Sequence, residues 1–321
     1  MTKPALSIVI PTHQTRELTL CCLASLAAAE DREGLGESEW IVVDDGSRDG
    51  TAEALAARHP KTEVVRNQSP RGFTRAANQG MARARGELLL LLNSDTEVRP
   101  GALTALLAAF AQDARLGVGG AHLFYPDGRP QWSAGELPGL LWFFSQASAL
   151  PATLARLPGY RRLKPAGRNT SSGVVGWVTG AALAIRRPLW QEIGPFDETF
   201  RLYAQDLDLC HLVGKAGWKV ALVPGFEVVH HHGATIQEHR SRQTIDRQHS
   251  ALLWQDLLTW AAKHRGAGFA GRVRRALRWG SGLRLLARNC LRPWRSAAER
   301  QAYDRDTEAL RAARREISPL P

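Results

Sequence analysis

The stretch LSIVIPT (residues 6–12) is a nearly continuous run of apolar and β-branched residues that ends in Pro11 and Thr12. Such a run suits a strand that is buried on both faces. Residues 17–30 (ELTLCCLASLAAAE) then show helical spacing, and residues 40–51 (WIVVDDGSRDGT) give a second apolar strand that ends in carboxylates. We therefore predict that residue 6 begins a sheet whose strands are separated by helices.

The same alternation continues along the chain. The further expected strands are 62–67, 86–98, 176–187 and a pair within 219–232. The further expected helices are 51–59, 73–84, 100–112 and 206–218, with Pro100 at the first position of the third. Strands that alternate with helices predict an α/β protein with a parallel sheet wrapped by helices.

Residues 113–170 show weaker periodicity than their neighbours. They contain turn residues (YPDGRP), a cluster of aromatic residues (LLWFFSQ) and a basic patch (YRRLKPAGR). Two interpretations stay open for this region, a mobile loop over a site and an irregular excursion of the chain.

Composition excludes several classes of protein. A chain of 321 residues with 44% hydrophobic residues is long enough for a large domain with an appendage. The four cysteines form no CxxC pair, which excludes a zinc knuckle or a disulfide framework and favours a reducing compartment. The first residues lack the pattern of an export signal. The apolar runs at 88–92 and 173–185 are too short to cross a bilayer.

The positive charge lies in the last quarter of the chain. Residues 1–239 carry 24 Lys and Arg and 24 Asp and Glu, whereas residues 240–321 carry 18 and 7. We therefore predict a main domain at 1–239 and a basic helical region at 240–321. Residues 269–294 mix Arg with Leu, Val and Trp. Two interpretations stay open, a helix at an anionic membrane interface and a helix docked on the main domain with solvated Arg side chains. No motif supports binding to nucleic acid.

Polar residues follow several of the expected strands. They are Thr12 and His13, Asp44 and Asp45, and the NSD tripeptide at 93–95. In a parallel sheet the carboxyl ends of the strands meet at one edge, and ligands bind beyond that edge. In the strand expected at 176–187, Gly180 is small enough for the close approach of a ligand or of another backbone.

A divalent cation is expected at the same edge. Asp95 follows five leucines, and a hard cation such as Mg²⁺ or Mn²⁺ takes one or two carboxylates and fills its other positions with water and phosphate oxygens. An imidazole from His230, His231 or His232 would favour Mn²⁺. Each motif also has a structural explanation, since NSDT suits an Asx turn and three histidines suit a polar strand end.

Asp206 and Asp208 stand in YAQDLDL, at the start of the helix expected at 206–218. An Asp in this place is first of all a candidate N-cap, because its side chain accepts hydrogen bonds from the free amides of the first turn. A catalytic base is the alternative.

Eight segments, taken together and in this order, resemble the family 2 glycosyltransferases. They are LSIVIPTH, IVVDDGSRDGT, RGFTRAANQG, LLLLNSDTEV, GAALAIRR, GPFDETF, YAQDLDLCHLVGKAGW and VVHHHGAT. The likeness is to the rhamnosyltransferase branch and covers residues 5–237. It implies the GT-A fold of the nucleotide-diphospho-sugar transferases, with a mixed, mostly parallel central sheet flanked by helices and a basic helical C-terminal extension. The resemblance implies three roles. Asp206 is the general base, and Asp95 and His230 bind the metal. The residues near the donor are Pro11, Thr12, Asp44, Asp45, Arg75 or Arg71, Ser94 and Gly180.

The implied reaction is a single inverting displacement on a nucleotide-diphosphate sugar, with a UDP- or dTDP-sugar as donor. The acceptor is a saccharide or a lipid-linked saccharide in cell-surface polysaccharide synthesis. The protein is expected to be cytoplasmic, with its C-terminal helices as the candidate contact to the inner face of the membrane. Gln205 stands where the family often has Glu, and NSD offers one carboxylate where some relatives have two, so we expect an altered pH optimum and retained activity.

Two other functions are considered. One is an inactive transferase-like module that binds nucleotide and acts through its basic tail, and the intact Asp45, Asp95, Asp206 and His230 speak against it. The other is a nucleotidyltransferase, which would need a Gly-rich basic phosphate loop after the first strand. PTHQTRE at 11–17 is no such loop.

Overall fold

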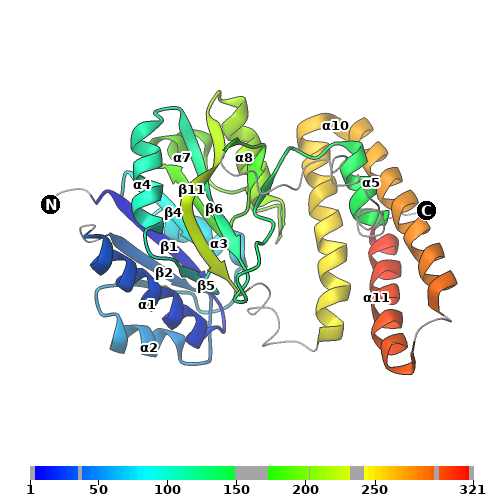
Figure 1. Cartoon of the computed structure of the whole chain (residues 1–321), viewed down its shortest axis with the longest axis horizontal. Helices are drawn as coiled ribbons and strands as arrows, with labels where there is room; N and C mark the ends of the chain where they lie inside the picture. The colour runs from blue at the N-terminus through cyan, green and yellow to red at the C-terminus, as the bar shows by residue number, and fades with distance from the viewer. Residues whose placement is uncertain are drawn as a thin grey trace. The chain divides into compact units, whose positions relative to one another are not determined.

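The computed structural model describes residues 4–34, 38–148, 173–201, 203–231, 242–292 and 296–317. The described residues form two units (Figure 1). The first unit lies within 1–137, 168–201 and 205–239, and the second lies within 138–167, 202–204 and 240–321.

The first unit is built on a mixed sheet. Four parallel strands form one half of it in the order β3-β2-β1-β4: β1 (Leu6–Thr12), β2 (Glu39–Asp44), β3 (Glu63–Arg66) and β4 (Leu88–Leu92). The other half continues with β10 (Ala182–Arg186), β6 (Leu116–Phe124), β11 (Lys219–His230) and β5 (Thr96–Val98), with β8 (Gly173–Val174) also beside β11. β10 runs antiparallel to both of its neighbours, β4 and β6, whereas β11 is parallel to β6.

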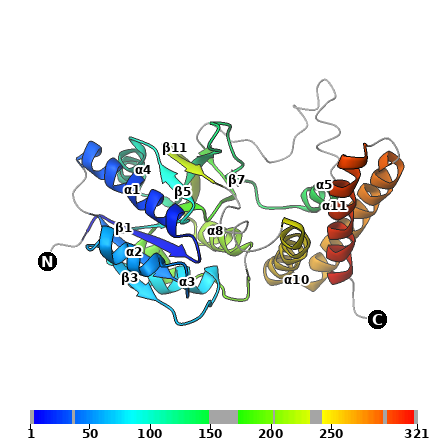
Figure 2. The same cartoon turned by 90° about the horizontal axis from the view of Figure 1, so that it is seen from below.

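Helices cover both faces of this sheet, so side chains on both faces of its central strands are buried. On one face lie α1 (Arg16–Glu33), α2 (Thr51–Arg58) and α4 (Ala102–Gln112), packed on residues such as Ile8, Ile10 and Leu90. On the other lie α3 (Phe73–Met81), α7 (Arg187–Ile193) and α8 (Gln205–Lys215), packed on Val9 and Leu91. Figure 2 shows α1 and α3 on opposite sides of β1. This double burial is why β1 and β4 are continuous apolar runs.

The region of weak periodicity, for which a mobile loop and an irregular excursion were both open, contains a central strand, β6. Its sequence LGVGGAHLF is rich in glycine, which weakens the strand pattern. A Cβ at Gly119 would lie 2.8 Å from the Phe110 ring, and one at Gly120 would lie 2.5 Å from Val178. Packing against these neighbours therefore requires glycine at both positions, and these glycines are what weakens the strand pattern in the sequence. Residues 149–172, with the basic patch, lie outside the described part of the chain.

Other boundaries differ from those expected. Residues 86–98 form two strands, β4 and β5, that are separated by the NSD tripeptide. Residues 176–187 form β9 (Trp177–Val178) and β10, which a turn at 179–181 separates; β9 pairs with β7 (Ala134–Gly135) in a second sheet. The strand pair expected at 219–232 is a single strand, β11, whose register shifts between Leu222 and Glu227. Helix α4 has Gly101 as its N-cap, so Pro100 precedes the helix.

The second unit is helical. It contains α5 (Leu140–Ser148), α10 (Arg242–Leu291) and α11 (Ala297–Glu316). The backbone of Gly266 (φ 78, ψ 166) is not helical and divides α10 into two helices. Trp260, Val273 and Leu277 are fully buried. In the part of the chain that the structure describes, no helix is both long and apolar enough to cross a membrane.

Candidate active site

The strand ends that carry polar residues meet at one edge of the main sheet. Thr12 and Asp44 are register partners at the ends of β1 and β2. The amide of Asn93, directly after β4, donates to the carbonyl of Ala181 at 2.9 Å and so joins this edge to the turn before β10. The amide of His231, directly after β11, donates to the carbonyl of Asp95 at 2.9 Å. The candidates from β1, β2, β4 and β11 therefore share one edge.

Thr12 and Ser94 belong to a buried cluster of hydroxyl groups. Thr12 Oγ1 lies 2.9 Å from Thr15 Oγ1 and 2.7 Å from Thr19 Oγ1, and Thr15 Oγ1 lies 3.1 Å from Ser94 Oγ. These hydrogen bonds fix the start of α1 against the NSD tripeptide. They connect two segments that lie 79 residues apart in sequence.

Asp45 is 4% exposed, and its carboxylate holds a turn of the chain in place. Oδ1 accepts from Asn67 Nδ2 at 2.8 Å and from the Arg71 amide at 2.9 Å, and Oδ2 accepts from the Arg71 and Gly72 amides at 2.9 and 2.8 Å. Gly72 is the N-cap of α3, where amides are otherwise unpaired and a negative charge is favourable. The structure therefore gives Asp45 a positioning role at the start of α3.

Two buried oxygens at this edge have no hydrogen-bond donor among the described residues, Asp44 Oδ2 and Asn93 Oδ1. Asp44 is fully buried; its Oδ1 accepts from the Ser47 amide at 2.9 Å, and Arg66 Nε lies 3.9 Å from its Oδ2. A buried acceptor without a donor is costly, so each oxygen is suited to accept from a ligand. Asn93 was not among the predicted site residues, although its place at the head of NSD was a signal for it.

Asp95 and His230 lie side by side. The distance from Asp95 Oδ1 to His230 Nε2 is 3.3 Å, and both side chains are buried. His230 Nδ1 lies 3.1 Å from Gln131 Oε1, which orients the ring. Within the described residues no three His, Cys, Asp or Glu side chains form a metal-binding group. A metal at this pair would therefore need oxygen ligands from water or a bound diphosphate.

The other two histidines of the run are not in this pair. His231 Nε2 lies 2.7 Å from Glu97 Oε1, so its ring is turned toward a different carboxylate. His232 lies outside the described residues.

Asp206 is the second residue of α8 and not its N-cap, because the helix begins at Gln205. Its Oδ2 accepts from the Gly180 amide at 2.8 Å, and its Oδ1 accepts from the Leu207 amide at 2.8 Å. Burial raises the pKa of Asp206, and the two amide hydrogen bonds partly oppose that shift. Asp208, in contrast, is 2% exposed and lies on the buried side of α8.

Gly180 serves this site through its backbone. A Cβ there would lie 3.6 Å from Asp206 Cβ, an ordinary van der Waals distance, so the carboxylate does not require a glycine. The close approach that the sequence predicted is that of the Gly180 amide to the carboxylate. Ala204, directly before α8, has a positive φ of 64°, which is strained for a residue with a side chain.

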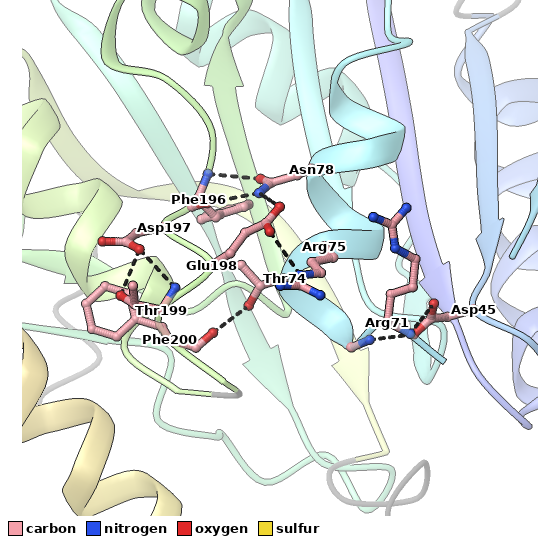
Figure 3. Close-up of polar contacts among 11 residues, drawn as sticks. Asp45, Arg71, Thr74, Arg75, Asn78, Phe196, Asp197, Glu198, Thr199 and Phe200 are labelled. Carbon is pink, nitrogen blue, oxygen red and sulfur yellow. Dashed lines mark hydrogen bonds and ion pairs between the residues drawn. The ribbon is translucent and has the colours of Figure 1, made fainter. Parts of the chain in front are cut away.

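Helix α3 also holds the segment that leads to α8 (Figure 3). The Asn78 side chain pairs with both backbone groups of Phe196: Oδ1 accepts from the Phe196 amide at 2.9 Å, and Nδ2 donates to the Phe196 carbonyl at 2.9 Å. Thr74 Oγ1 donates to the Phe200 carbonyl at 3.1 Å. Asp197 accepts from Thr199 within the segment. We call this set of contacts the α3 brace.

Arg75, predicted near the donor, lies in the α3 brace. Its Nε donates to Glu198 Oε2 at 2.9 Å, and both side chains are about half exposed (Figure 3). Because Asp45 fixes the start of α3 and α3 fixes residues 196–200, a single helix connects the turn after β2 with the segment before Asp206.

Comparison with known sequences gives a family. Residues 7–193 match the sequence profile described as Glycosyl transferase family 2. The N-acetylglucosaminyl-diphospho-decaprenol L-rhamnosyltransferase of Mycobacterium tuberculosis is 33% identical over 226 residues, which are 65% of this chain and 70% of that protein. The O-antigen biosynthesis protein RfbC of Myxococcus xanthus is 26% identical over 240 residues, 72% of this chain and 18% of that protein.

Solved structures agree with the fold. The mannosyltransferase PcManGT of Pyrobaculum calidifontis, in complex with GDP-Man and Mn²⁺, matches with a TM-score of 0.59 at 16% identity and covers 99% of this chain and 88% of its own. GalNAc-T7 with UDP, GalNAc and Mn²⁺ matches with a TM-score of 0.52 at 18% identity, over 71% of this chain and 44% of its own. At such identities the likeness concerns the fold, and the predicted GT-A fold is confirmed.

Proposed function

The chain belongs to glycosyl transferase family 2, and from that premise we propose a metal-dependent inverting transferase that moves a sugar from a UDP- or dTDP-sugar to a lipid-linked saccharide. The observation that carries the proposal is the hydrogen bond from the Gly180 amide to Asp206 Oδ2. Asn93 binds the neighbouring Ala181, so this bond ties Asp206 to the sheet edge where Asp95 and His230 lie.

The donor nucleotide is assigned to the ends of β1, β2 and β4. Pro11 and Thr12 end β1 beside Asp44, whose Oδ2 lacks a hydrogen-bond donor among the described residues. A uracil or thymine N3–H and the ribose hydroxyls are donors of the kind that a carboxylate at this edge accepts. Asp45 then acts by shaping the turn before α3, and Ser94 by its contact with Thr15.

The residues present fit a divalent cation. Asp95 supplies a carboxylate and His230 an imidazole, and Asn93 Oδ1 is a further oxygen without a donor among the described residues. This set suits Mn²⁺ or Mg²⁺ that completes its coordination with water and the donor diphosphate. When bound, such a cation would stabilise the negative charge that develops on the leaving diphosphate.

Asp206 is the proposed general base. An alcohol is a poor nucleophile until a base can take its proton, and an inverting displacement needs one base for the acceptor hydroxyl. Amide donors from Gly180 and Leu207 hold the carboxylate in one orientation. The raised pKa of Asp206 makes it a stronger proton acceptor once it is ionised.

The names of two relatives support a proposal for the acceptor. The name of the mycobacterial relative includes N-acetylglucosaminyl-diphospho-decaprenol, a sugar linked to a long-chain alcohol, and that of the myxobacterial relative includes O-antigen biosynthesis. We propose a similar lipid-linked acceptor in polysaccharide synthesis. The protein then works in the cytoplasm at the inner face of the membrane, with 1–239 as the catalytic domain and the basic region 240–321 as its membrane contact.

A nucleotide-sugar screen tests the proposal. UDP-, dTDP- and GDP-sugars are tested with Mn²⁺ for thermal stabilisation and for hydrolysis, on the wild type and on Asp206→Asn. We expect one nucleotide sugar to stabilise both proteins and only the wild type to turn it over. Equal turnover by the variant contradicts the role of Asp206. Stabilisation without turnover by the wild type, with a lipid-linked acceptor present, supports a binding module instead.

A further inference from the structure

The second half of α10 carries an exposed apolar stripe. Trp279, Leu283 and Leu286 are 72%, 46% and 62% exposed, whereas Val273 and Leu277 on the same helix are fully buried. At about 100° per residue, Arg272, Arg275, Trp279, Leu283, Leu286 and Cys290 all lie within about 40° of one direction. We call this row of six side chains the α10 stripe. Large apolar side chains in a row on a surface mark a binding site.

The other sides of this helix are covered within the second unit. Near Gly280, a Cβ would lie 2.6 Å from the Phe144 carbonyl oxygen and 3.0 Å from Ala147, so α5 packs there. On another side Arg288 donates to the Tyr303 carbonyl and to Thr307 Oγ1 of α11. The helix is thus held by α5 and α11, and the α10 stripe is the side that these contacts leave open.

The stripe carries two arginines and lies in a strongly basic part of the chain. Arg272 and Arg275 are exposed and lie at its amino-terminal end. On another side of α10, about 120° round the helix from the stripe, Leu285 lines a hollow together with Arg311, Arg314 and Arg315 of α11. Residues 240–321 carry 18 Lys and Arg against 7 Asp and Glu. The stripe therefore combines apolar side chains with the charge that attracts phosphate groups.

We propose that the α10 stripe binds the surface of an anionic lipid bilayer. Trp279, Leu283 and Leu286 enter the boundary between the headgroups and the acyl chains, and Arg272 and Arg275 pair with lipid phosphates. The inference deepens the proposed function by naming the lipid surface that meets the second unit, and it rests on that function only for its setting.

Chemistry favours a bilayer over two other occupants. A nucleic acid would be bound by a basic groove with stacking aromatics, whereas this stripe presents aliphatic side chains beside its one Trp. A second copy would bring the same arginines to the interface, and like charges would oppose each other there. An anionic bilayer matches both the apolar side chains and the positive charge.

Flotation of the full chain with vesicles tests the proposal. We expect binding to vesicles of phosphatidylcholine with about a third phosphatidylglycerol and weak binding to phosphatidylcholine alone, with loss of binding in high salt. Leu283→Ser with Leu286→Ser should weaken binding at least tenfold. Arg272→Gln with Arg275→Gln should weaken it about thirtyfold, from about 1 kcal/mol for each charge.

Matched controls come from the first unit. Val174→Ser removes a 65% exposed apolar side chain, and Arg32→Gln with Arg58→Gln removes two exposed charges; both should bind vesicles like the wild type. If these controls lose as much binding as the stripe variants, the stripe is not the contact. Donor hydrolysis without vesicles should be unchanged in the stripe variants. Because vesicle binding needs no donor or acceptor, it tests the surface separately from the transferase activity.

An environment-sensitive fluorophore gives a second readout. Cys290 lies in the stripe and is exposed, whereas Cys21 is the exposed cysteine of α1, and Cys22 and Cys210 are buried. A label on Cys290 in Cys21→Ser should shift to the blue with anionic vesicles, and a label on Cys21 in Cys290→Ser should not. A silent Cys290 label overturns the proposal, as does a dimer that Leu283→Ser with Leu286→Ser separates, or RNA binding that exceeds vesicle binding.

Discussion

The pairing of Asn78 with Phe196 offers the sharpest test of how the site is held together. Asn78→Ala removes two hydrogen bonds of 2.9 Å and leaves both backbone groups of Phe196 without their partner. At about 0.5–1.5 kcal/mol for each neutral hydrogen bond, the loss is about 2 kcal/mol. For a domain of this size we expect the melting temperature to fall by about 4–8 °C. The protein should still be folded at 25 °C.

Activity should fall by more than stability explains. Residues 196–200 lead directly to α8, and a displacement of about 1 Å in a positioning segment lowers turnover roughly a hundredfold. We therefore expect kcat for the preferred nucleotide sugar to fall about 10- to 100-fold in Asn78→Ala. Asn78→Asp should be worse at neutral pH, because its carboxylate would face the Phe196 carbonyl and Glu198.

Arg186 provides the matched control. Its guanidinium donates to the carbonyls of Leu116, Phe110 and Asp113, at the sheet edge opposite the site. Arg186→Met should lower the melting temperature at least as much as Asn78→Ala while kcat for the folded enzyme stays within about twofold, since the positioning cost applies only near the reacting groups. If Asn78→Ala loses stability but keeps kcat, or if Arg186→Met loses kcat equally, the α3 brace does not position Asp206.

Three further predictions concern single residues. Gly46→Ala should destabilise the protein more than Gly50→Ala in a denaturant titration: both have positive φ, but only the Cβ at Gly46 would meet backbone atoms, at 2.8 Å from Ser69; equal losses would show that φ alone matters. Burial raises the folded-state pKa of Asp206, so turnover should rise with pH through that pKa. Folding stability should fall as pH rises from the ordinary Asp pKa to the raised one. Asp206→Asn should abolish both changes, and an unaltered pH profile speaks against Asp206 as the base. His230→Ala should weaken the affinity for Mn²⁺, measured by thermal stabilisation, at least about tenfold, since even residues that only orient metal ligands contribute that much. His231→Ala should leave that affinity unchanged. If His231→Ala weakens it and His230→Ala does not, His231 is the imidazole ligand.

The sequence predicted the elements whose pattern and packing agree. β1 matches its predicted bounds because all seven of its residues are buried between helices, which leaves an unbroken apolar run. β6 was missed because Gly117, Gly119 and Gly120 are set by neighbours distant in sequence, among them Leu189, Phe110 and Val178. A local pattern cannot report a requirement that arises only when remote segments pack together.

In the site, likewise, the sequence predicted which residues matter but not which groups they contact. Motif order pointed to Asp95, His230 and Asp206, and the structure brings the first two within 3.3 Å. Motif order could not show that the Asp45 carboxylate accepts hydrogen bonds from the Arg71 and Gly72 amides, because those bonds depend on the path of the loop after β3. Nor could it show that Arg75 faces Glu198, which lies 123 residues later.

Buried oxygens without donors extend this argument from whole residues to individual atoms, which the motifs could not single out. Within the described chain, Asp44 Oδ2, Asn93 Oδ1 and Gln205 Oε1 are such atoms, and they stand at the end of β2, directly after β4 and at the start of α8. Each costs about 1–3 kcal/mol if nothing donates to it. A sugar nucleotide and an acceptor saccharide are rich in hydroxyl donors, so binding them would recover part of that free energy. Gln205, the departure from the family's Glu, can still accept such a hydrogen bond without adding a second charge beside Asp206.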